Sequence, residues 1–239
     1  MEREVPIAFA YYAVGDEYKR MMEHSAESLR RHLPNADIRI IDDQRLPATI
    51  GDFKAKYQTH FPGGIRFGVA SMFRLGIPLM EQFADCKRVV WLDADTEVMS
   101  SEIGRLATIN LKGKELGAGL DIVSNRYARP EILANVLGTQ KHKTYFNTGV
   151  IVFDLERIAK DIWETRLNQM LDGFVSHADK LRYADQDVLN AYCDICEIPS
   201  RFDCLAKWHF APRRYCIAVR DPVVLHYAGQ SRKYYSKEK

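Results

Sequence analysis

A short apolar run that ends in two carboxylates constrains the fold of this chain more than any other stretch. Val89 to Leu92 predicts a strand buried on both faces, and Asp93 and Asp95 follow it directly. In open α/β sheets, ligands bind beyond the carboxyl ends of the strands. Two carboxylates at such an edge supply hard oxygen ligands, which suit Mg2+ or Mn2+. The alternative is a turn in which each carboxylate caps a backbone N–H, and the motif alone leaves both interpretations open.

Predicted strands and helices alternate along the chain. Strands are expected over residues 5–14, 38–41, 89–92, 116–123, 150–154 and 223–225, and helices over residues 16–31, 54–61, 69–83, 102–107, 156–174 and 185–192. Pro78 should kink or divide the helix over residues 69–83. The alternation in the first hundred residues is typical of a parallel sheet with crossover helices. No repeat, low-complexity tract or linker appears, which predicts a single α/β domain over residues 1–239.

Charge and hydropathy exclude some classes of protein. The chain of 239 residues carries a formal net charge of +2, which argues against a dedicated nucleic-acid binder because neutralising phosphates needs a strong cationic excess. No apolar run approaches the ~20 residues of a membrane span. The apolar stretch from Val5 to Val14 follows Glu2-Arg3-Glu4, which lacks the positive charge that precedes a signal peptide's apolar region. We therefore expect this stretch to be the first strand.

The cysteines allow two interpretations. An odd number, five, without any N-x-[ST] sequon predicts a reducing, cytoplasmic location, which is compatible with peripheral contact at the inner face of a membrane. A structural zinc site is the alternative, because two of the cysteines have the right spacing, but no second close pair follows. We favour small core residues for all four candidates, Cys193, Cys196, Cys204 and Cys216.

Several segments, in order along the chain, carry a family resemblance. They are Phe9 to Tyr18 with Ser28-Leu29, Phe73-Arg74-Leu75, Trp91 to Thr96, Tyr145 to Val150, Asp185 to Asn190, and His226-Tyr227-Ala228-Gly229. With these segments the chain resembles glycosyltransferase family 8. That family is the retaining, metal-dependent group with the GT-A fold, and it includes glycogenin and bacterial lipopolysaccharide galactosyl- and glucosyltransferases.

The resemblance implies a fold and a division of labour along the chain. It implies one GT-A (Rossmann-like) domain, in which helices flank a central mixed, mostly parallel sheet. Residues 1–100 would form the nucleotide-binding half, which ends in the Asp-x-Asp motif. Residues 101–231 would form the donor-sugar and acceptor half, and residues 232–239 a basic C-terminal tail.

The resemblance also implies a metal site. In the family, the residues that correspond to Asp93 and Asp95 hold Mn2+, which bridges the two phosphates of a UDP-sugar. The metal neutralises charge on the departing UDP, as a Lewis acid does. A lone histidine after an apolar strand, such as His226, is more often a hydrogen-bonded core residue. The family pattern His-x-x-Gly, completed here by Gly229, implies instead that His226 is the third protein ligand.

Further positions correspond to residues that contact the donor in the family. Arg74 would be costly if buried alone, and it matches an arginine that contacts the donor. Asn147 could be a simple turn residue, but the family places this amide near the donor sugar. Asp121 matches a donor-side acid less securely. The full set of donor-binding candidates is Tyr11, Tyr12, Tyr18, Arg74, Asp93, Ala94, Asp95, Asp121, Asn147, Thr148, Gly229 and Arg232.

Asp185 and Gln186 are the catalytic candidates. From sequence alone they could be an N-terminal helix cap and its exposed neighbour. The resemblance implies instead that the carboxylate grips sugar hydroxyls and that the amide lies close to the anomeric carbon. Since an amide is a poor nucleophile, we favour front-face attack, in which the departing phosphate takes the acceptor's proton, over a covalent intermediate.

Two regions carry weaker expectations. Tyr11, Tyr12 and Tyr18 could be core aromatics, or they could form the family's first loop, which holds uracil by stacking and backbone hydrogen bonds. Arg232 stands where the family has a lysine on the diphosphate, and Lys233-Tyr234 replaces its Pro-Trp. Arginine can bind two phosphate oxygens at once, so we expect Arg232 to take over this contact. The alternative is a solvated basic tail.

The expected activity is transfer of a hexose, most readily glucose or galactose, from a UDP-sugar to an acceptor, with Mn2+ or Mg2+ as cofactor. The acceptor would be a glycan, a lipid-linked molecule or a protein. One alternative is a non-catalytic nucleotide-sugar or metal-binding protein on the same fold. Another is a haloacid dehalogenase-type phosphatase, which Glu97 argues against because that class has Thr or Val there. The glycine motifs of Rossmann dehydrogenases and P-loop enzymes do not occur.

Overall fold

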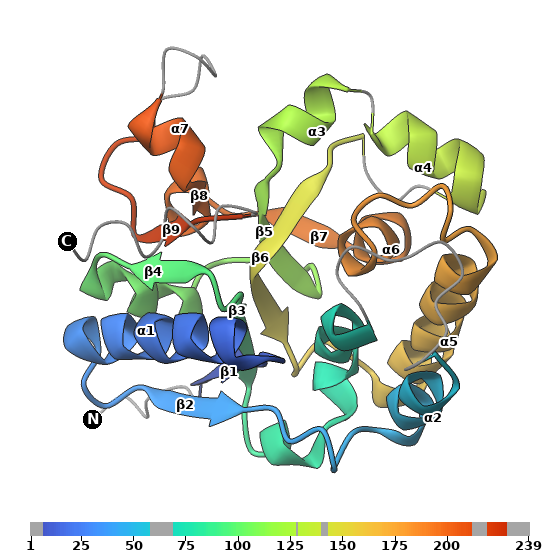
Figure 1. The fold of residues 1–239 in the computed structure, drawn as a ribbon, viewed down its shortest axis with the longest axis horizontal. Coiled ribbons are helices and arrows are strands. Elements are labelled where there is room, and N and C mark those ends of the chain that lie inside the picture. The colour runs from blue at the N-terminus through green and yellow to red at the C-terminus, as the bar shows by residue number, and fades with distance from the viewer. Residues whose placement is uncertain (1–6, 58–68, 128, 140–142, 212–218, 229–239) are drawn as a thin grey trace.

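A six-stranded sheet forms the centre of the computed structural model (Figure 1), which describes residues 7–57, 69–127, 129–139, 143–211 and 219–228. The strand order is β2-β1-β3-β6-β5-β7. Only β6 runs against its neighbours, whereas the pairs β1–β2, β1–β3 and β5–β7 are parallel. The predicted mixed, mostly parallel sheet is therefore confirmed. The strands are β1 (Ile7–Tyr11), β2 (Asp37–Ile40), β3 (Arg88–Leu92), β5 (Leu116–Leu120), β6 (Phe146–Asp154) and β7 (Ile195–Glu197).

The reversed strand brings polar residues to one edge of the sheet. Leu92 at the end of β3 pairs with Val150, and Leu120 at the end of β5 pairs with Phe146 at the start of β6. The amino end of β6 thus lies between the carboxyl ends of two parallel strands. Carboxyl ends are where α/β sheets bind ligands, so this edge positions the candidate site.

Both faces of the sheet are packed. On β3, Val89 and Trp91 belong to one hydrophobic cluster, while Val90 and Leu92 belong to the other. Side chains alternate between faces along a strand, so a strand covered on both faces is apolar at every position. This two-sided burial explains why the apolar run in the sequence shows no alternation.

Helices cover one face, and a helix with a small second sheet covers the other. The first face packs against α2 (Ala48–Tyr57), the 3-10 segment η1 (Val69–Leu79), α5 (Lys160–Ser176) and α6 (Asp185–Tyr192). The second face packs against α1 (Asp16–His32), η3 (Ser101–Ala107) and a sheet of order β4-β9-β8 (Thr96–Val98, Val224–His226, Cys204–Leu205). Figure 1 shows α1 and α5 on opposite sides, and α3 (Ile122–Arg126) and α4 (Arg129–Leu137) beyond the end of β5. The remaining segments are η2 (Glu81–Phe83), η4 (Ser200–Phe202) and α7 (Ala206–Phe210).

The predicted elements are mostly present, with differences at their ends. The helix over residues 185–192 has the predicted bounds, while the predicted strand over residues 116–123 stops at Leu120, because Asp121 caps α3. The strand predicted from residue 150 begins at Phe146. The helix predicted from residue 54 begins at Ala48, and its predicted residues 58–61 lie outside the described ranges. Sequence patterns missed several elements that are short or lack a clear period, namely α3, α4, α7, η4, β4, β7 and β8.

The segment over residues 69–83 differs in kind from the prediction. It is divided at Met80 into two 3-10 segments, η1 and η2, whereas the prediction was an α-helix kinked or divided at Pro78. A proline inside an α-helix removes a backbone donor and clashes with the preceding turn, which favours shorter-range hydrogen bonding here. No helix in the described ranges is both long and apolar enough to cross a membrane.

Candidate metal centre

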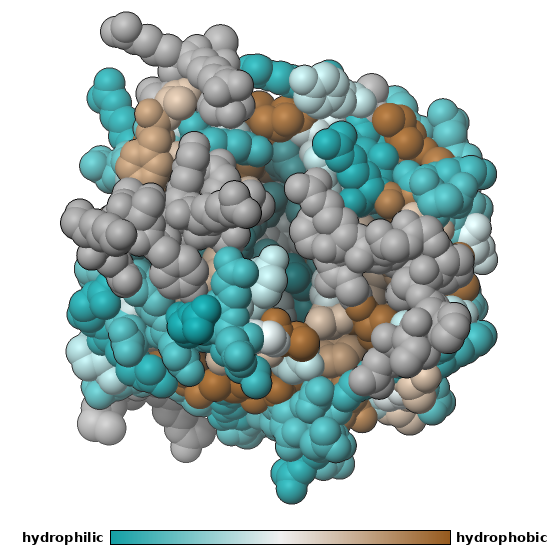
Figure 2. Space-filling model, viewed as in Figure 1, coloured by the Kyte–Doolittle hydropathy of each residue, from teal (hydrophilic) through white to brown (hydrophobic). Residues whose placement is uncertain are grey.

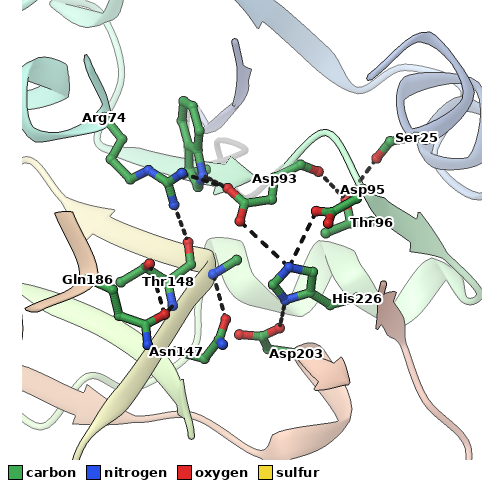
Figure 3. Close-up of polar contacts among 12 residues, drawn as sticks. Ser25, Arg74, Asp93, Asp95, Thr96, Asn147, Thr148, Gln186, Asp203 and His226 are labelled. Atoms are coloured by element: carbon green, nitrogen blue, oxygen red, sulfur yellow. Dashed lines mark hydrogen bonds and ion pairs between the residues drawn. The ribbon is translucent and has the colours of Figure 1, made fainter. Parts of the chain in front are cut away.

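Two carboxylates and one imidazole meet at the edge of the central sheet (Figure 3). His226 Nε2 lies 3.4 Å from Asp95 Oδ1 and 3.6 Å from Asp93 Oδ2. One ligand atom from each of the three residues lies within 4.8 Å of the others, and among the described residues no other such group of three occurs. Two hard oxygens and one nitrogen fit a divalent cation. The structure thus brings together the three residues that the sequence predicts as metal ligands.

Backbone pairing places these residues. Asp93 and Asp95 lie in the turn between β3 and β4, and His226 ends β9, which pairs antiparallel with β4 so that His226 is opposite Thr96. The Asp93 N–H donates to the carbonyl of Gly149 at 2.8 Å, and the Thr96 N–H donates to the Asp93 carbonyl at 3.2 Å. Backbone groups therefore close this turn, and both carboxylates face His226.

Asp203 orients the histidine and was missed from the sequence. Its Oδ1 lies 3.0 Å from His226 Nδ1, and its side chain is fully buried. A carboxylate on one ring nitrogen fixes the ring and leaves the other nitrogen for a metal. One feature of the sequence could have indicated this role. Asp203 lies in an otherwise apolar run, between Phe202 and Cys204-Leu205, and an acid buried in such a run needs a partner.

Two glycines make room for this pair. A Cβ on Gly149 in β6 would lie 2.1 Å from His226 Cε1 and 2.2 Å from its Nδ1. A Cβ on Gly119 would lie 3.0 Å from Asp203 Cβ, at the point where the register between β5 and β6 shifts. The absence of side chains at these two positions lets the imidazole and its carboxylate pack against the sheet backbone.

The charged forms of His226 and Asp95 stabilise each other. Burial by itself lowers the pKa of His226, but the carboxylates of Asp95 and Asp203 raise that pKa well above its ordinary value. Burial raises the pKa of Asp95, but His226 and Arg74 lower it overall. A divalent cation held by these side chains would take the place of the imidazole proton, as metal binding to histidine requires.

Arg74 links the metal centre to the catalytic candidates. Its Nη2 lies 2.8 Å from Asp93 Oδ1 and its Nε 3.2 Å from Asp185 Oδ2, while Nη1 donates to the Thr148 carbonyl at 2.7 Å. The guanidinium carbon lies 4.5 Å from the centroid of the Trp91 ring. Burial lowers its pKa, but Asp185 and Asp93 raise it overall, so Arg74 stays charged. The nitrogens of Arg74 contact protein groups, and its predicted contact with a donor stays a prediction.

Asp185 and Gln186 form the first turn of α6 and are both buried. Burial raises the pKa of Asp185 to about 6, with Arg74 acting to lower it and Asp93 to raise it. Gln186 Oε1 accepts from the Thr148 N–H at 3.1 Å, and its Nε2 donates to Asp121 Oδ2 at 3.4 Å. The amide is thereby fixed, and the interpretation of Gln186 as an exposed neighbour of a cap is wrong.

The start of β6 is held by side-chain amides. Asn147 Oδ1 accepts from the Gly149 N–H at 2.8 Å, which is the local contact expected of a turn asparagine. Asn190, which sequence reasoning left out, accepts from the Phe146 N–H at 2.7 Å and donates to the Phe146 carbonyl at 2.9 Å. This pair of bonds ties α6 to β6. Asp121 Oδ1 accepts from the Ser124 N–H at 3.0 Å and so caps α3.

The remaining donor-binding candidates lie apart from this cluster or outside the described residues. Tyr11 is fully buried and its hydroxyl lies 3.1 Å from Ser25 Oγ, so its ring is part of the core, and its predicted backbone contact with uracil stays a prediction. The side chain of Ala94, between Asp93 and Asp95, is buried in the hydrophobic cluster that also contains Tyr11. The Tyr12 hydroxyl donates to Asp43 at 3.2 Å, and Tyr18 is 51% exposed on α1, so Tyr18 is not a core aromatic. Gly229 and Arg232 lie outside the described ranges.

Figure 2 shows that this face of the molecule is hollowed near its centre, and the described residues visible inside the hollow are mostly hydrophilic.

The predicted core role fits the three described cysteines of the zinc alternative, because each is buried within one of the two hydrophobic clusters. In the described part of the chain, none of these cysteines belongs to a group that could hold a metal. The fourth, Cys216, lies outside the described residues.

We predict that Asp203→Ala weakens Mn2+ binding by about 10- to 100-fold, because the imidazole loses the partner that orients it. Asp203→Asn, which keeps an acceptor but loses the charge, should fall between that variant and the parent. Titration of free Mn2+ followed by electron paramagnetic resonance measures the affinity. Asp194→Ala, at a half-exposed acid paired with Lys114, is the control and should bind like the parent. Parental affinity in Asp203→Ala would contradict the orienting role.

Gly149→Ala should weaken Mn2+ binding at least about tenfold and lower the free energy of unfolding by about 1–3 kcal/mol, because the new methyl group overlaps the His226 ring. Gly51→Ala in α2 is the matched control, since nothing lies within 4 Å of its added Cβ. The control should change the free energy of unfolding by less than about 1 kcal/mol. Urea denaturation and Mn2+ titration of both variants measure the effects. An unchanged Mn2+ affinity in Gly149→Ala would show that the ring is not held against β6.

Comparison with known proteins agrees with this geometry. Residues 7–234 match the sequence profile described as Glycosyl transferase family 8. Over 92 residues the chain is 27% identical to the glycosyltransferase-like protein LARGE of Caenorhabditis elegans, a match that covers 36% of this chain and 14% of that protein. The chain therefore spans only a small part of this relative.

Solved structures show the same architecture. One is the galactosyltransferase LgtC in complex with donor and acceptor sugar analogues, with a TM-score of 0.64, 24% sequence identity, and coverage of 93% of this chain and 87% of that chain. Another is the glycosyltransferase GlyE of Streptococcus pneumoniae, with a TM-score of 0.59 and 18% sequence identity; the match covers 97% of this chain and 57% of that chain. The fold is that of GT-A glycosyltransferases. With its family profile matched over nearly all of its length, the chain belongs to glycosyl transferase family 8.

Proposed function

We propose that this protein is a metal-dependent, retaining hexosyltransferase that moves glucose or galactose from a UDP-sugar to an acceptor. The observation that carries the proposal is the convergence of Asp93, Asp95 and His226 at the carboxyl edge of the sheet, in a chain of this family. Mn2+ or Mg2+ held there would neutralise charge on the departing diphosphate. The acceptor would be a glycan, a lipid-linked molecule or a protein.

The residues around the metal centre would hold the donor sugar. Thr148 contacts both Asp185 and Gln186, with its hydroxyl 3.4 Å from Asp185 Oδ2 and 3.3 Å from Gln186 Oε1. Asp121 and Asn147 lie beside them at the ends of β5 and β6. We propose that these five residues form the donor-sugar side of the site, and that Gly229 and Arg232 contact the diphosphate.

The contacts of Asp185 and Gln186 favour front-face attack. The carboxylate of Asp185 is paired with Arg74, and charge pairing of this kind weakens a carboxylate as a nucleophile. Gln186 carries an amide, which is a poor nucleophile, and its fixed carbonyl oxygen offers a dipole to positive charge that develops at the anomeric carbon. The acceptor's proton would pass to the departing phosphate, and the donor's α linkage would remain α in the product. A solved structure of similar fold is an active-site glutamine-to-glutamate variant of LgtC.

Two other points belong to the proposal. A non-catalytic nucleotide-sugar binder on the same fold is the second candidate, and turnover distinguishes it from an enzyme; the phosphatase alternative is wrong, because the chain belongs to a glycosyltransferase family. We also propose a cytoplasmic location, compatible with contact at the inner face of a membrane, which the odd number of cysteines without an N-x-[ST] sequon supports.

We predict that UDP is released from UDP-glucose or UDP-galactose only with Mn2+ or Mg2+ present, and that EDTA abolishes the release. Asp95→Asn should lower turnover at least about 100-fold, because it removes a charged metal ligand that also pairs with His226. Asp52→Asn, at an exposed position of α2, is the matched control and should turn over like the parent. A coupled assay for UDP measures turnover by the parent with metal, by the parent with EDTA, and by each of the two variants with metal. Turnover in EDTA, or full activity of Asp95→Asn, would contradict the proposed metal-dependent function.

A further inference from the structure

The third residue of the Asp185-Gln186-Asp187 segment has an environment unlike that of the first two. Asp187 is completely buried. Its Oδ1 accepts from Arg129 Nε at 3.0 Å and from the Tyr145 hydroxyl at 2.6 Å. Its Oδ2 accepts from Arg129 Nη2 and from the backbone N–H groups of Arg182 at 2.8 Å and Tyr183 at 2.9 Å. A carboxylate has about four acceptor positions, so these five donors occupy all of them.

The contacts of Asp187 lie next to a strained residue. Ala184, the N-cap of α6, has φ 45° and ψ −110° and is buried. A β-carbon makes this region costly, by ~1–3 kcal/mol, and glycine is the residue that adopts it freely. The N–H groups of Arg182 and Tyr183, just before Ala184, are the ones that Asp187 binds. Asp187 therefore closes the turn that contains the strained residue.

This turn sets the direction of the catalytic candidates. Asp185 and Gln186 follow Ala184 directly, and the Gln186 N–H donates to the Tyr183 carbonyl at 2.9 Å. A turn that relaxed at Ala184 would rotate the first turn of α6 away from Thr148 and Arg74, which contact these two side chains. Displacements of about 1 Å at a catalytic group cost about 100-fold in rate.

We propose that Asp187 is a positioning residue, which holds Ala184 in its strained conformation so that Asp185 and Gln186 face the donor sugar. Since hydrogen bonds occupy its lone pairs, its carboxylate does not attack the sugar. Arg129 and Tyr145 supply the opposing contacts, from α4 and from the residue before β6. The predicted effect on catalysis rests on the proposed function, whereas the role of Asp187 in holding the turn at Ala184 does not.

The test is to restore the turn by a different route. We expect Asp187→Asn to lower kcat for UDP release from the UDP-hexose that the parent turns over, by at least about tenfold, while the affinity for Mn2+ with UDP stays within about threefold. Adding Ala184→Gly should then raise kcat by at least about fivefold, because glycine adopts the required φ without help. In the parent, Ala184→Gly should change kcat by less than about twofold. This double-mutant cycle isolates the coupling between the two positions.

Hydrogen exchange gives a readout that needs no turnover. In Asp187→Asn, one carboxylate oxygen becomes an NH2 group, and five donors compete for the oxygen that remains. The amides of Arg182 and Tyr183 should therefore exchange faster than in the parent, and so should the Gln186 amide, because the turn relaxes. Adding Ala184→Gly should slow the exchange of the Gln186 amide again. If no UDP-hexose is turned over by the parent, the proposed function is wrong, and this exchange still decides the role of Asp187.

Tyr145→Phe serves if Asp187→Asn does not fold. It removes one hydrogen bond to Asp187 but keeps the ion pair with Arg129, and we expect a smaller loss of kcat that Ala184→Gly again reverses. The proposal is overturned if Ala184→Gly restores nothing in a folded Asp187→Asn or Tyr145→Phe protein. It is also overturned if the amides of Arg182 and Tyr183 exchange at the parental rate in Asp187→Asn.

Discussion

A single buried guanidinium ties together the elements that build the candidate site. Arg74 is 7% exposed, and its nitrogens meet Asp93 after β3, Asp185 at the start of α6 and the Thr148 carbonyl in β6. A buried charge without partners is strongly destabilising, so a fold that buries Arg74 has to bring all three groups to it. The ring of Trp91 under the guanidinium adds a favourable cation–π contact. Loss of Asp93 or Asp185 would remove one of the two carboxylates that face this buried charge, which couples the metal-ligand candidate and the catalytic candidates to the core.

The reversed strand β6 explains why many of the candidate residues lie at one edge of the central sheet. A purely parallel sheet would place only carboxyl ends there, whereas β6 adds its amino end, with Asn147 and Thr148, between the ends of β3 and β5. Gly149 on the same strand leaves room for the His226 ring, and Gly119 on β5 leaves room for Asp203. The site is therefore built from the sheet backbone as much as from its side chains.

Local patterns predicted part of this arrangement. The strand before Asp93 and the helix beginning at Asp185 were predicted because their apolar runs and end signals lie within the segments themselves. The roles of Asp203 and Asn190 depend on partners 23 and 44 residues away in the chain, which a pattern of a few residues does not contain. The 3-10 geometry of η1 was mistaken for an α-helix for a related reason: Pro78 is visible in the sequence, but the packing of η1 against α2 and α5, which acts together with the proline, is not.

The proposed function requires that Asp93, Asp95 and His226 hold a divalent cation together. Anomalous diffraction from crystals grown with Mn2+ and UDP tests it directly, because manganese alone gives the signal at its absorption edge. We predict a peak within about 2.5 Å of a carboxylate oxygen of each aspartate and of His226 Nε2, with Asp203 still bound to Nδ1. A manganese peak elsewhere in the protein, or one that His226 does not reach, would contradict it.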